Sequence, residues 1–576
     1  MEGIPNWKKI GAQKRAALQA LIPPEWRLPH PLPSPSELPD VTGKAIQQYL
    51  SPREVQITET DAATLVRKLA MGEWRSREVT LAFCHRAAVA HQMISCLHEI
   101  FFETAIKDAE DLDAYWDQDH KPTGPLHGLP VSLKDVMHVK GIGISVGFVG
   151  RLGTAGDGRF ESEIVTMLRS LGAVLYVKTS VPTGSFTGET FNNIIQYTPN
   201  PKNRLLTVGG SSGGEGGLLA LKGSPLGIGT DIGGSVRVPA VWNGCCGLKP
   251  ATCRFPFHGV ESIVEGQTTV PFVVGFMAPS VEALTLVTRS LLSLQPWMRD
   301  PLVHEIPWRD EIFRETIRRA DRQGSQLSFG IMRTDGHVHP QPPVLRAIDM
   351  TVAAIKSLGH SVIEWKPPSH AEAFKLWLKA TTIDGGKNFH GSLRLTGEPA
   401  YRVDLDEFFA VKDRPSTVFG LGPSRQANAG EIMEINTAIQ KYRTAYLQCW
   451  QQTAGLTDTG RPVDVFIMPV APTPAPERGK VRYFGYTTVI NVLDYTACAI
   501  PVTEVRKEID VFPCQQYEPL NKLDQLVHDD YNAELAHGSS VGIQIVGRRL
   551  REEQVLALAE VLDREFRRSA RDESKL

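Results

Sequence analysis

Two serines of this chain lie inside clusters of glycine, within residues 209–250. The stretch reads GGSSGGEGGLLALKGSPLGIGTDIGGSVRVPAVWNGCCGLKP, with Ser211 in the first cluster and Ser235, 24 residues further along, in the second. Glycine permits backbone conformations and close approaches that a Cβ would prevent, at a cost in folding entropy. Glycines gathered around hydroxyls therefore predict backbone N–H groups that meet a small negative group, either an oxyanion or a phosphate.

The spacing of the glycines disfavours the phosphate. A phosphate loop of the Walker type requires G-x-x-x-x-G-K-[ST], which does not occur in the sequence. The nearest dinucleotide-like pattern starts at Gly227 and reads G-x-G-x-x-x-G, which is one residue too long. The oxyanion is the better interpretation.

An oxyanion site needs a nucleophile, and Ser235 is the better candidate of the two serines. It directly follows Ile232, Gly233 and Gly234, whose N–H groups could converge on a carbonyl oxygen. A serine hydroxyl is a poor nucleophile unless a neighbouring base takes its proton. The sequence must therefore supply a base from elsewhere.

Lys134 is the candidate base. It ends the apolar run 129–133, which is typical of a buried strand. A lysine held there loses solvation, which lowers its pKa and favours the neutral amine that a base requires. The alternative is an ion pair between Lys134 and the adjacent Asp135. Spacing alone does not separate these two interpretations.

Three separated motifs carry a resemblance to a known family. GLPVSLKD at 128–135, GGSSGGEGG at 209–217 and GTDIGGSVRVPA at 229–240 resemble the amidase signature family of serine hydrolases. Further stretches, among them ITETDA, LHEIFFETA, GEPAYRVDL and HVHPQPPVLRA, are similar to its fungal acetamidase-like, or general amidase, members. The resemblance extends from about residue 55 to residue 565. It implies a single large α/β/α domain with a mixed central sheet covered by helices.

The resemblance also implies a reaction. Ser235 matches the nucleophile, Ser211 the bridging serine and Lys134 the base of a Ser-Ser-Lys triad. The implied activity is cleavage of the C–N bond of a carboxylic amide to an acid and ammonia or an amine, through an acyl-enzyme. Two alternatives remain open: an amidotransferase-type subunit that delivers ammonia to a partner, and an esterase or fatty-amide hydrolase built on the same residues.

Other positions of the glycine-rich stretch match supporting roles in the family. The implied oxyanion hole is formed by the N–H groups of Ile232, Gly233, Gly234 and Ser235. The resemblance implies a cis peptide bond that enters Ser211, and Gly209 and Gly210 suit the bend and a place beside the substrate.

Three polar residues near the two serines are expected to support the site. Ser212 is expected to hydrogen-bond within the same network. Asp231 and Arg237 flank Ser235 and either pair to hold its loop or form an ordinary loop salt bridge.

Composition limits the partners of the protein. Of its 576 residues 42% are apolar and 22% charged, which predicts a globular core, and the net charge of −2 gives no reason to expect nucleic acid or an anionic membrane as a partner. No run approaches the roughly 18 apolar residues of a spanning helix. His337 and His339 form an H-x-H pair without a third ligand in view, so neither a metal nor another cofactor is expected. The expected partner is a small amide substrate, and a homodimer is the default oligomer.

The chain divides into three predicted parts. Residues 1–55 form an N-terminal helical and proline-rich arm, 56–565 the catalytic domain, and 566–576 a tail. The basic helical pattern at the start predicts either a helix strapped over the body or a transit helix, and we favour the first. Scattered cysteines without a signal peptide indicate reduced intracellular thiols.

Local patterns predict the first elements of the catalytic domain. Helices are expected over 59–71, 77–91 and 101–116, with Thr58 or Thr60 as the first N-cap. Residues 161–179 predict a helix, a turn and then a buried strand, which is the alternation of an α/β sheet.

The region 370–460 is rich in aromatic residues. Trp377, Phe389, Phe408 and Phe409 are candidates for the wall of an acyl pocket, but helical aromatic residues more often belong to the core, which we favour.

The chain ends in Ser574-Lys575-Leu576. This tripeptide is a peroxisomal address, so we expect recognition by the import receptor and a peroxisomal location, with the cytoplasm as the alternative.

Overall fold

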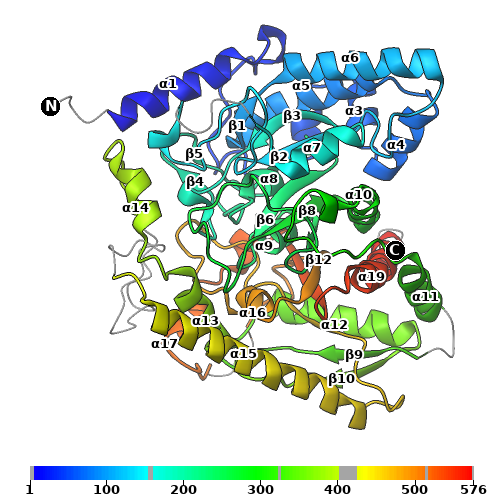
Figure 1. Cartoon of the computed structure of the whole chain (residues 1–576), viewed down its shortest axis with the longest axis vertical. Helices are drawn as coiled ribbons and strands as arrows, with labels where there is room; N and C mark the ends of the chain where they lie inside the picture. Colours follow the sequence, from blue (N-terminus) through cyan, green and yellow to red (C-terminus); the bar gives the residue numbers. More distant parts are fainter. Residues whose placement is uncertain (1–5, 154–159, 322–325, 401–424, 513–516, 574–576) are drawn as a thin grey trace.

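A mixed sheet flanked by helices forms the centre of the molecule (Figure 1). The computed structural model describes residues 6–153, 160–321, 326–400, 425–512 and 517–573. In spatial order the strands of the sheet are β1 (Leu97–Ile100), β3 (Val174–Thr179), β2 (Pro130–Lys134), β6 (Gly227–Asp231), β8 (Val273–Ala278), β7 (Cys246–Lys249), β12 (Thr496–Glu504), β13 (Ser540–Gly547), β11 (Val465–Pro469), β9 (Ser328–Ile331) and β10 (Ser361–Glu364). The pairs β3–β2 and β2–β6 near one edge and β11–β9 and β9–β10 at the other are parallel, whereas all pairs from β6–β8 to β13–β11 between them are antiparallel. The predicted α/β/α class with a mixed sheet is confirmed.

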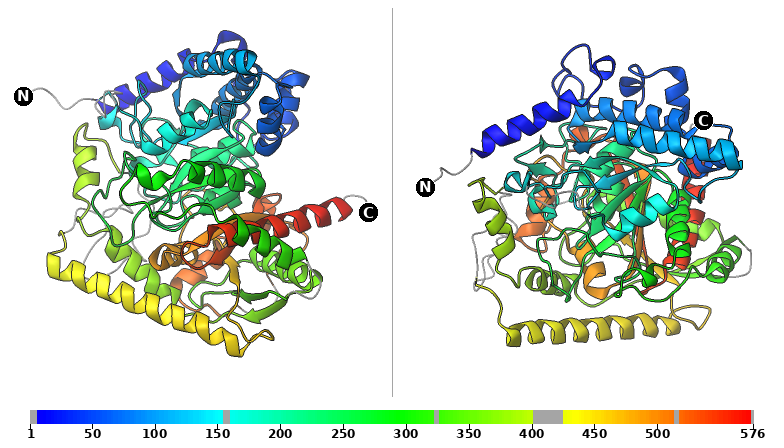
Figure 2. Two further views of the ribbon diagram at one scale, coloured as in Figure 1. Left: turned by 45° about the vertical axis from the view of Figure 1, so that its right-hand side comes forward. Right: turned by 45° about the horizontal axis from the view of Figure 1, so that its top comes forward.

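The helices are distributed around this sheet. They are α1 (Trp7–Ala20), α2 (Lys44–Gln47), α3 (Pro52–Thr58), α4 (Ala62–Ala70), α5 (Ser76–Ile94), α6 (Phe102–Asp119), α7 (Glu163–Ser170), α8 (Gly213–Ala220), α9 (Arg237–Trp242), α10 (Val281–Ser293), α11 (Asp310–Asp321), α12 (Pro342–Ser357), α13 (His370–Thr381), α14 (Lys387–Arg394), α15 (Ala429–Gln452), α16 (Gly485–Leu493), α17 (Lys522–Asp529), α18 (Ala533–Ala536) and α19 (Glu552–Glu573). Helices α5 and α6 cover one end of the molecule, and the long α15 lies across the opposite end (Figures 1 and 2).

The strands that lead to the two serine motifs are buried along their whole length. Every residue of β2, β3 and β6 is buried. The apolar run before Lys134 therefore forms the interior strand that its composition predicts, since strands covered on both faces have no need for polar alternation. The helix, turn and strand expected over 161–179 are confirmed as α7 and β3.

The helices predicted at the start of the catalytic domain are confirmed as α4, α5 and α6, but the predicted N-cap is wrong. Asp61 caps α4, because its carboxylate accepts a hydrogen bond from the N–H of Ala63. Thr58 is instead the last residue of α3, and its hydroxyl donates to the carbonyl oxygen of Glu54. Asp and Thr are both good N-caps, so the choice depended on where α3 ended.

The segment before the catalytic domain runs over its surface. Helix α1 forms where the basic pattern predicts a helix, and Arg15 donates a 2.6 Å hydrogen bond to the carbonyl oxygen of Ile194. Further along, the Arg204 guanidinium donates to the carbonyl oxygens of Pro33 and Leu38. These contacts attach the proline-rich segment to the body; the division into arm, domain and tail stays a prediction.

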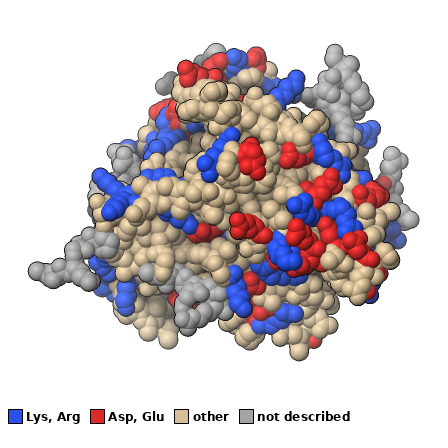
Figure 3. Space-filling model, turned by 90° about the horizontal axis from the view of Figure 1, so that it is seen from above, with Lys and Arg blue, Asp and Glu red and all other residues tan. Residues whose placement is uncertain are grey.

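The surface mixes charges of both signs. Lys and Arg lie interspersed with Asp and Glu on the face seen in Figure 3. Within the described residues, none of the helices has the length and apolar character needed to cross a membrane. The described cysteines are all free thiols, and no group of three or more His, Cys, Asp and Glu side chains in the same residues could hold a metal ion. Phe408, Phe409 and the C-terminal Ser574-Lys575-Leu576 lie outside the described residues.

Candidate active site

Lys134 is fully buried at the end of β2 and points to the first serine motif. Its Nζ donates a 2.8 Å hydrogen bond to Ser211 Oγ and a 2.9 Å bond to Thr230 Oγ1. The ion pair with the adjacent Asp135 is not formed, because that carboxylate pairs with Lys178 at 2.7 Å and with His98 at 3.1 Å. The hydrogen-bond partners of Lys134 are therefore two hydroxyl groups and, at 3.5 Å, the carbonyl oxygen of Thr230, and not a carboxylate.

Burial decides the protonation state of Lys134. Removal from water lowers the pKa of its ammonium group to about 7, although the negative charges of Asp231 and Glu215 oppose this shift. An ordinary lysine keeps its proton until about pH 10.4. At neutral pH a substantial fraction of Lys134 is thus the free amine.

Ser211 occupies a tight bend before α8. The peptide bond between Gly210 and Ser211 is cis, as the family resemblance implies. Gly209 has φ +83°, a left-handed conformation that favours glycine, and a Cβ on Gly210 would lie 2.5 Å from the carbonyl oxygen of Thr187. The next residue, Ser212, donates its N–H to the carbonyl oxygen of Ser235 at 3.1 Å. This bond joins the two glycine clusters.

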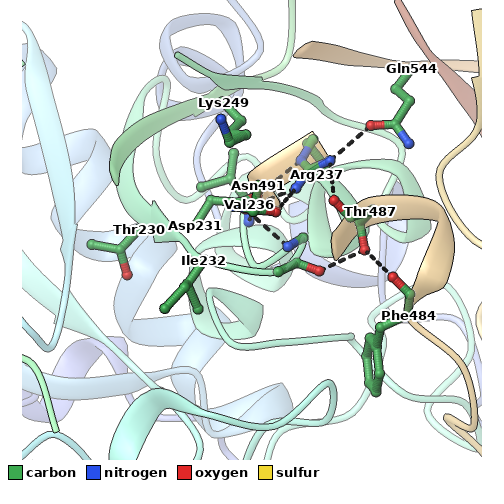
Figure 4. A network of polar contacts seen from close by, with 12 residues as sticks. Thr230, Asp231, Ile232, Val236, Arg237, Lys249, Phe484, Thr487, Asn491 and Gln544 are labelled. Carbon is green, nitrogen blue, oxygen red and sulfur yellow. Dashed lines mark hydrogen bonds and ion pairs between the residues drawn. The ribbon is translucent and has the colours of Figure 1, made fainter. Parts of the chain in front are cut away.

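Ser235 lies in the loop between β6 and α9, and Asp231 holds that loop. The Asp231 carboxylate accepts hydrogen bonds from the N–H groups of Gly234 (2.9 Å) and Val236 (3.1 Å), and forms a fully buried ion pair with Arg237 (2.9 Å; Figure 4). Asp231 therefore pairs with Arg237 and also holds the backbone of the loop that carries Ser235.

The ion pair is anchored in turn by the second half of the chain. The Arg237 guanidinium also donates to Asn491 Oδ1 at 2.7 Å and to Gln544 Oε1 at 2.9 Å (Figure 4). A buried charge is stable only when its hydrogen-bonding capacity is used. Helix α16 and strand β13 therefore fix the conformation of the loop that carries Ser235.

Two side chains from outside the motifs orient the peptides that precede Ser235. The Trp377 indole Nε1 donates to the carbonyl oxygen of Ile232 at 2.6 Å, and Thr487 Oγ1 donates to that of Gly233 at 2.6 Å. In a trans peptide the N–H points away from the C=O. The Gly233 N–H, which belongs to the same peptide as the Ile232 carbonyl, therefore points within the peptide plane away from the Trp377 indole.

Some of the N–H groups assigned to the oxyanion hole already donate a hydrogen bond within the protein, and others do not. The N–H of Gly234 is already bonded to Asp231. Within the described residues, the N–H groups of Ile232, Gly233 and Ser235 have no hydrogen-bond partner. These three are the donors that remain for an incoming oxygen atom.

A small pocket opens beside Ser235. Its lining includes Gly210, Ile232 and Ser235 together with the rings of Phe186, Trp377 and Phe484. Its volume, traced by the centre of a water molecule, is about 30 Å³. One water needs roughly 10–15 Å³ by this measure, so this inner space holds only a few heavy atoms, and a longer group would extend through the open side of the pocket.

The aromatic residues named in 370–460 have different surroundings in the structure. Trp377 lines the pocket and stacks on Phe186 with ring centroids 5.9 Å apart. Phe389 instead packs edge-to-face against Phe148 in the core. The favoured core interpretation holds for Phe389, whereas Trp377 follows the pocket alternative.

Sequence reasoning missed three polar residues around Lys134 and Ser211. Thr230 bonds to Lys134 and lies in the motif at 229–240, which also contains Ser235, so its position in the sequence was an available signal. Ser185 contacts Ser211 Oγ through its hydroxyl at 3.2 Å, and nothing near it in the sequence indicates this.

The third missed residue is Glu215, which follows the first glycine cluster and is fully buried beneath the site. It accepts hydrogen bonds from Ser132 (2.5 Å) and Thr179 (2.9 Å). Burial raises its pKa to about 7. The negative charge of Glu215 is one of the interactions that raise the pKa of Lys134.

Comparisons with known proteins bear on the family and the fold of this chain. A sequence model of the family Amidase matches residues 78–556. The chain is 41% identical to a protein named Acetamidase from Emericella nidulans, over 96% of this chain and 97% of that one, and 40% identical to an Acetamidase from Aspergillus oryzae, over 96% and 98%. A solved structure named Fatty acid amide hydrolase is similar, with a TM-score of 0.86 and 31% identity over 97% of this chain and 95% of that one. The chain therefore belongs to the Amidase family.

Proposed function

We propose that this amidase hydrolyses a small carboxylic amide to an acid and ammonia or an amine, with Ser235 as nucleophile, Ser211 as relay and Lys134 as base. The observation that carries the proposal is the 2.8 Å contact between the buried amine of Lys134 and Ser211 Oγ, next to the pocket that Ser235 lines. The backbone of Ser212, which follows Ser211, donates its N–H to the carbonyl oxygen of Ser235 and so holds the two glycine clusters together.

The reaction begins with proton transfer from Ser235 through Ser211 to Lys134. Neutral Lys134 accepts a proton from Ser211 while Ser211 accepts one from Ser235, whose oxygen attacks the amide carbonyl carbon. The N–H groups of Ile232, Gly233 and Ser235 then face the developing oxyanion, and one such donor contributes about 10²–10³ in rate.

The same groups complete the hydrolysis. The proton returns through Ser211 to the leaving nitrogen, the C–N bond breaks, and the acyl group stays on Ser235. Water then loses a proton to the relay and attacks the ester, which releases the acid and restores Ser235.

The size of the pocket supports a short acyl group. The inner space of about 30 Å³ beside Ser235 favours a short group there, and two of the relatives are named Acetamidase. The same observation disfavours a fatty-amide substrate, although one similar structure bears the name Fatty acid amide hydrolase. An amidotransferase-type subunit would pass ammonia to a partner and release little from a simple amide by itself.

Ammonia release from amides of graded length tests the proposal. We expect the purified chain to hydrolyse acetamide and butyramide with the highest kcat/KM, hexanamide less well and oleamide hardly at all, and phenyl acetate serves as the ester control. A maximum at long acyl chains, or ester cleavage without any amide cleavage, would contradict it.

Trp377→Ala should change this order. It removes one wall of the pocket, so we expect the ratio of kcat/KM for hexanamide over acetamide to rise about tenfold or more, because each methylene in an apolar pocket is worth about 1–3 kcal/mol. Trp377→Phe is the control: it keeps a ring in the wall but loses the hydrogen bond to Ile232, so kcat should fall without the change in order. Equal ratios for the wild type and Trp377→Ala would show that another wall of the pocket limits the length of the acyl chain.

Glu215→Gln should shift the pH dependence. Glu215 carries a partial negative charge near pH 7 and thereby raises the pKa of Lys134. Its removal lets Lys134 lose its proton at lower pH, so the acid limb of kcat/KM should move down by a fraction of a pH unit. Glu560→Gln, at a mostly buried carboxyl hydrogen-bonded to Thr285, is the matched control and should leave the limb in place. A limb that does not move with Glu215→Gln contradicts the assignment of Lys134 as the titrating base.

A further inference from the structure

Ser185 presents a third hydroxyl to the relay. It ends a short 3₁₀ turn (Thr183–Ser185) after β3, its side chain is buried, and it lines the same pocket as Ser235. Its Oγ donates to Ser211 Oγ at 3.2 Å. This contact reaches the oxygen that must accept and release a proton in the proposed reaction.

The number of hydrogen bonds that the Ser211 hydroxyl can form shows what the contact with Ser185 does. A serine hydroxyl has one donor and two acceptor lone pairs. When Lys134 is neutral, Ser211 donates its proton to Nζ and has two lone pairs left. Ser185 occupies one of them, which leaves the other for the proton of Ser235.

We propose that Ser185 is a further catalytic residue, which rests on the proposed function of Ser211 as the relay. As the proton of Ser235 moves to Ser211 Oγ and that of Ser211 moves to Lys134 Nζ, any lag between the two transfers leaves negative charge on Ser211 Oγ. The Ser185 hydroxyl keeps its own proton throughout and stabilises this charge by hydrogen bonding.

The surroundings of Ser185 hold it in an unusual conformation for this purpose. Its φ is +55°, in the left-handed region where non-glycine residues are uncommon. Its N–H donates to the carbonyl oxygen of Pro182 at 2.7 Å, and the N–H of Gly184 donates to that of Val146 at 2.9 Å. The loop around Val146 thus supports the turn directly.

Asp135 connects this loop to the strand that carries Lys134. Its carboxylate accepts hydrogen bonds from the Ser145 hydroxyl at 2.8 Å and from the N–H of Val146 at 3.1 Å. The residue beside the base therefore orders the loop on which the Ser185 turn rests, so that one strand end positions both neighbours of Ser211.

Ser185→Gly and Ser185→Ala test the hydroxyl separately from the backbone. Glycine favours a positive φ, so the first variant removes the hydroxyl without backbone strain, and alanine removes it while keeping the Cβ. We expect both to lower kcat about 10- to 100-fold with KM changed less than about 2-fold, and to slow the labelling of Ser235 by a fluorophosphonate by a similar factor.

A matched control lies in the same turn. The buried hydroxyl of Thr183 has no hydrogen-bond partner within the described residues, so Thr183→Val should retain the wild-type kcat and labelling rate. The proposal is overturned if both Ser185 variants keep wild-type kcat and labelling, or if Ser185→Gly is active and only Ser185→Ala is not. Because labelling needs no amide, it tests Ser185 even if the substrate class is wrong; labelling of a serine other than Ser235 in the wild type would instead refute the proposed function.

Discussion

Ser235→Ala is expected to abolish amide turnover and leave the protein folded. The variant keeps the loop between β6 and α9, because the Asp231–Arg237 pair and the hydrogen bonds to Gly234 and Val236 do not involve the Ser235 hydroxyl. It removes the atom that would form the acyl-enzyme. By comparison with other serine hydrolases, loss of the nucleophile lowers kcat about 10⁶-fold.

Three measurements check this expectation together. Ammonia release from acetamide should vanish, a fluorophosphonate should no longer label the chain, and the thermal unfolding midpoint should stay within a few degrees of the wild type. Ser293→Ala is the control, since this exposed serine donates only to the carbonyl oxygen of Ser290 on α10. Turnover at the wild-type rate in Ser235→Ala would refute the nucleophile.

Lys134→Met is expected to lower kcat about 10³-fold or more and to remove the acid limb of the pH profile. Methionine fills the buried site with an apolar chain of similar length but cannot accept a proton. In the wild type, kcat/KM should rise with pH through about 7, the pKa to which burial lowers the Lys134 ammonium, because only the free amine acts as a base. A variant that keeps both its rate and this limb would show that Lys134 is not the base.

Stability provides a second measurement on Lys134→Met. An unfolded lysine holds its proton up to about pH 10.4, whereas folded Lys134 releases it near pH 7. The unfolded state therefore binds more protons between these values, so the wild type should gain stability relative to the variant as pH rises from about 7 to 10.

Lys249→Met is the matched control for a buried lysine. Lys249 is also fully buried, with a pKa lowered to about 8, but its ammonium donates to the carbonyl oxygens of Pro250 and Tyr495. Its replacement measures how far the removal of a buried amine by itself changes activity and stability. The acid limb near pH 7 should remain in this control.

Elements with strong local patterns were predictable. The apolar run before Lys134 and the helix, turn and strand over 161–179 form β2, α7 and β3, because composition at these positions leaves little choice of burial. The N-cap of α4 was not predictable, since Thr58, Thr60 and Asp61 are all acceptable caps and the end of α3 decided among them.

The residues of the site also fall into two groups, those that the local sequence indicated and those that it did not. Ser211, Ser235, Asp231 and Arg237 were found because each lies inside or beside a glycine cluster. Thr487, which orients the carbonyl group of Gly233, comes from a helix far along the chain and carries no local signal. The aromatic pattern that singled out Trp377 did not indicate its hydrogen bond to the carbonyl oxygen of Ile232. A hydrogen bond between distant residues depends on packing, which no short motif records.

The sequence alone determined the chemical groups of this protein: two hydroxyls in glycine-rich bends, an amine at the end of an apolar strand, and the family to which these motifs point. Only the tertiary structure decided that Lys134 meets Ser211 while Asp135 turns to Lys178, and that the pocket beside Ser235 is small. The physical reason is that local propensity fixes which residues enter a strand or a bend. The partner of a buried charge and the volume of a cavity are set by the close packing of segments that lie far apart in the chain.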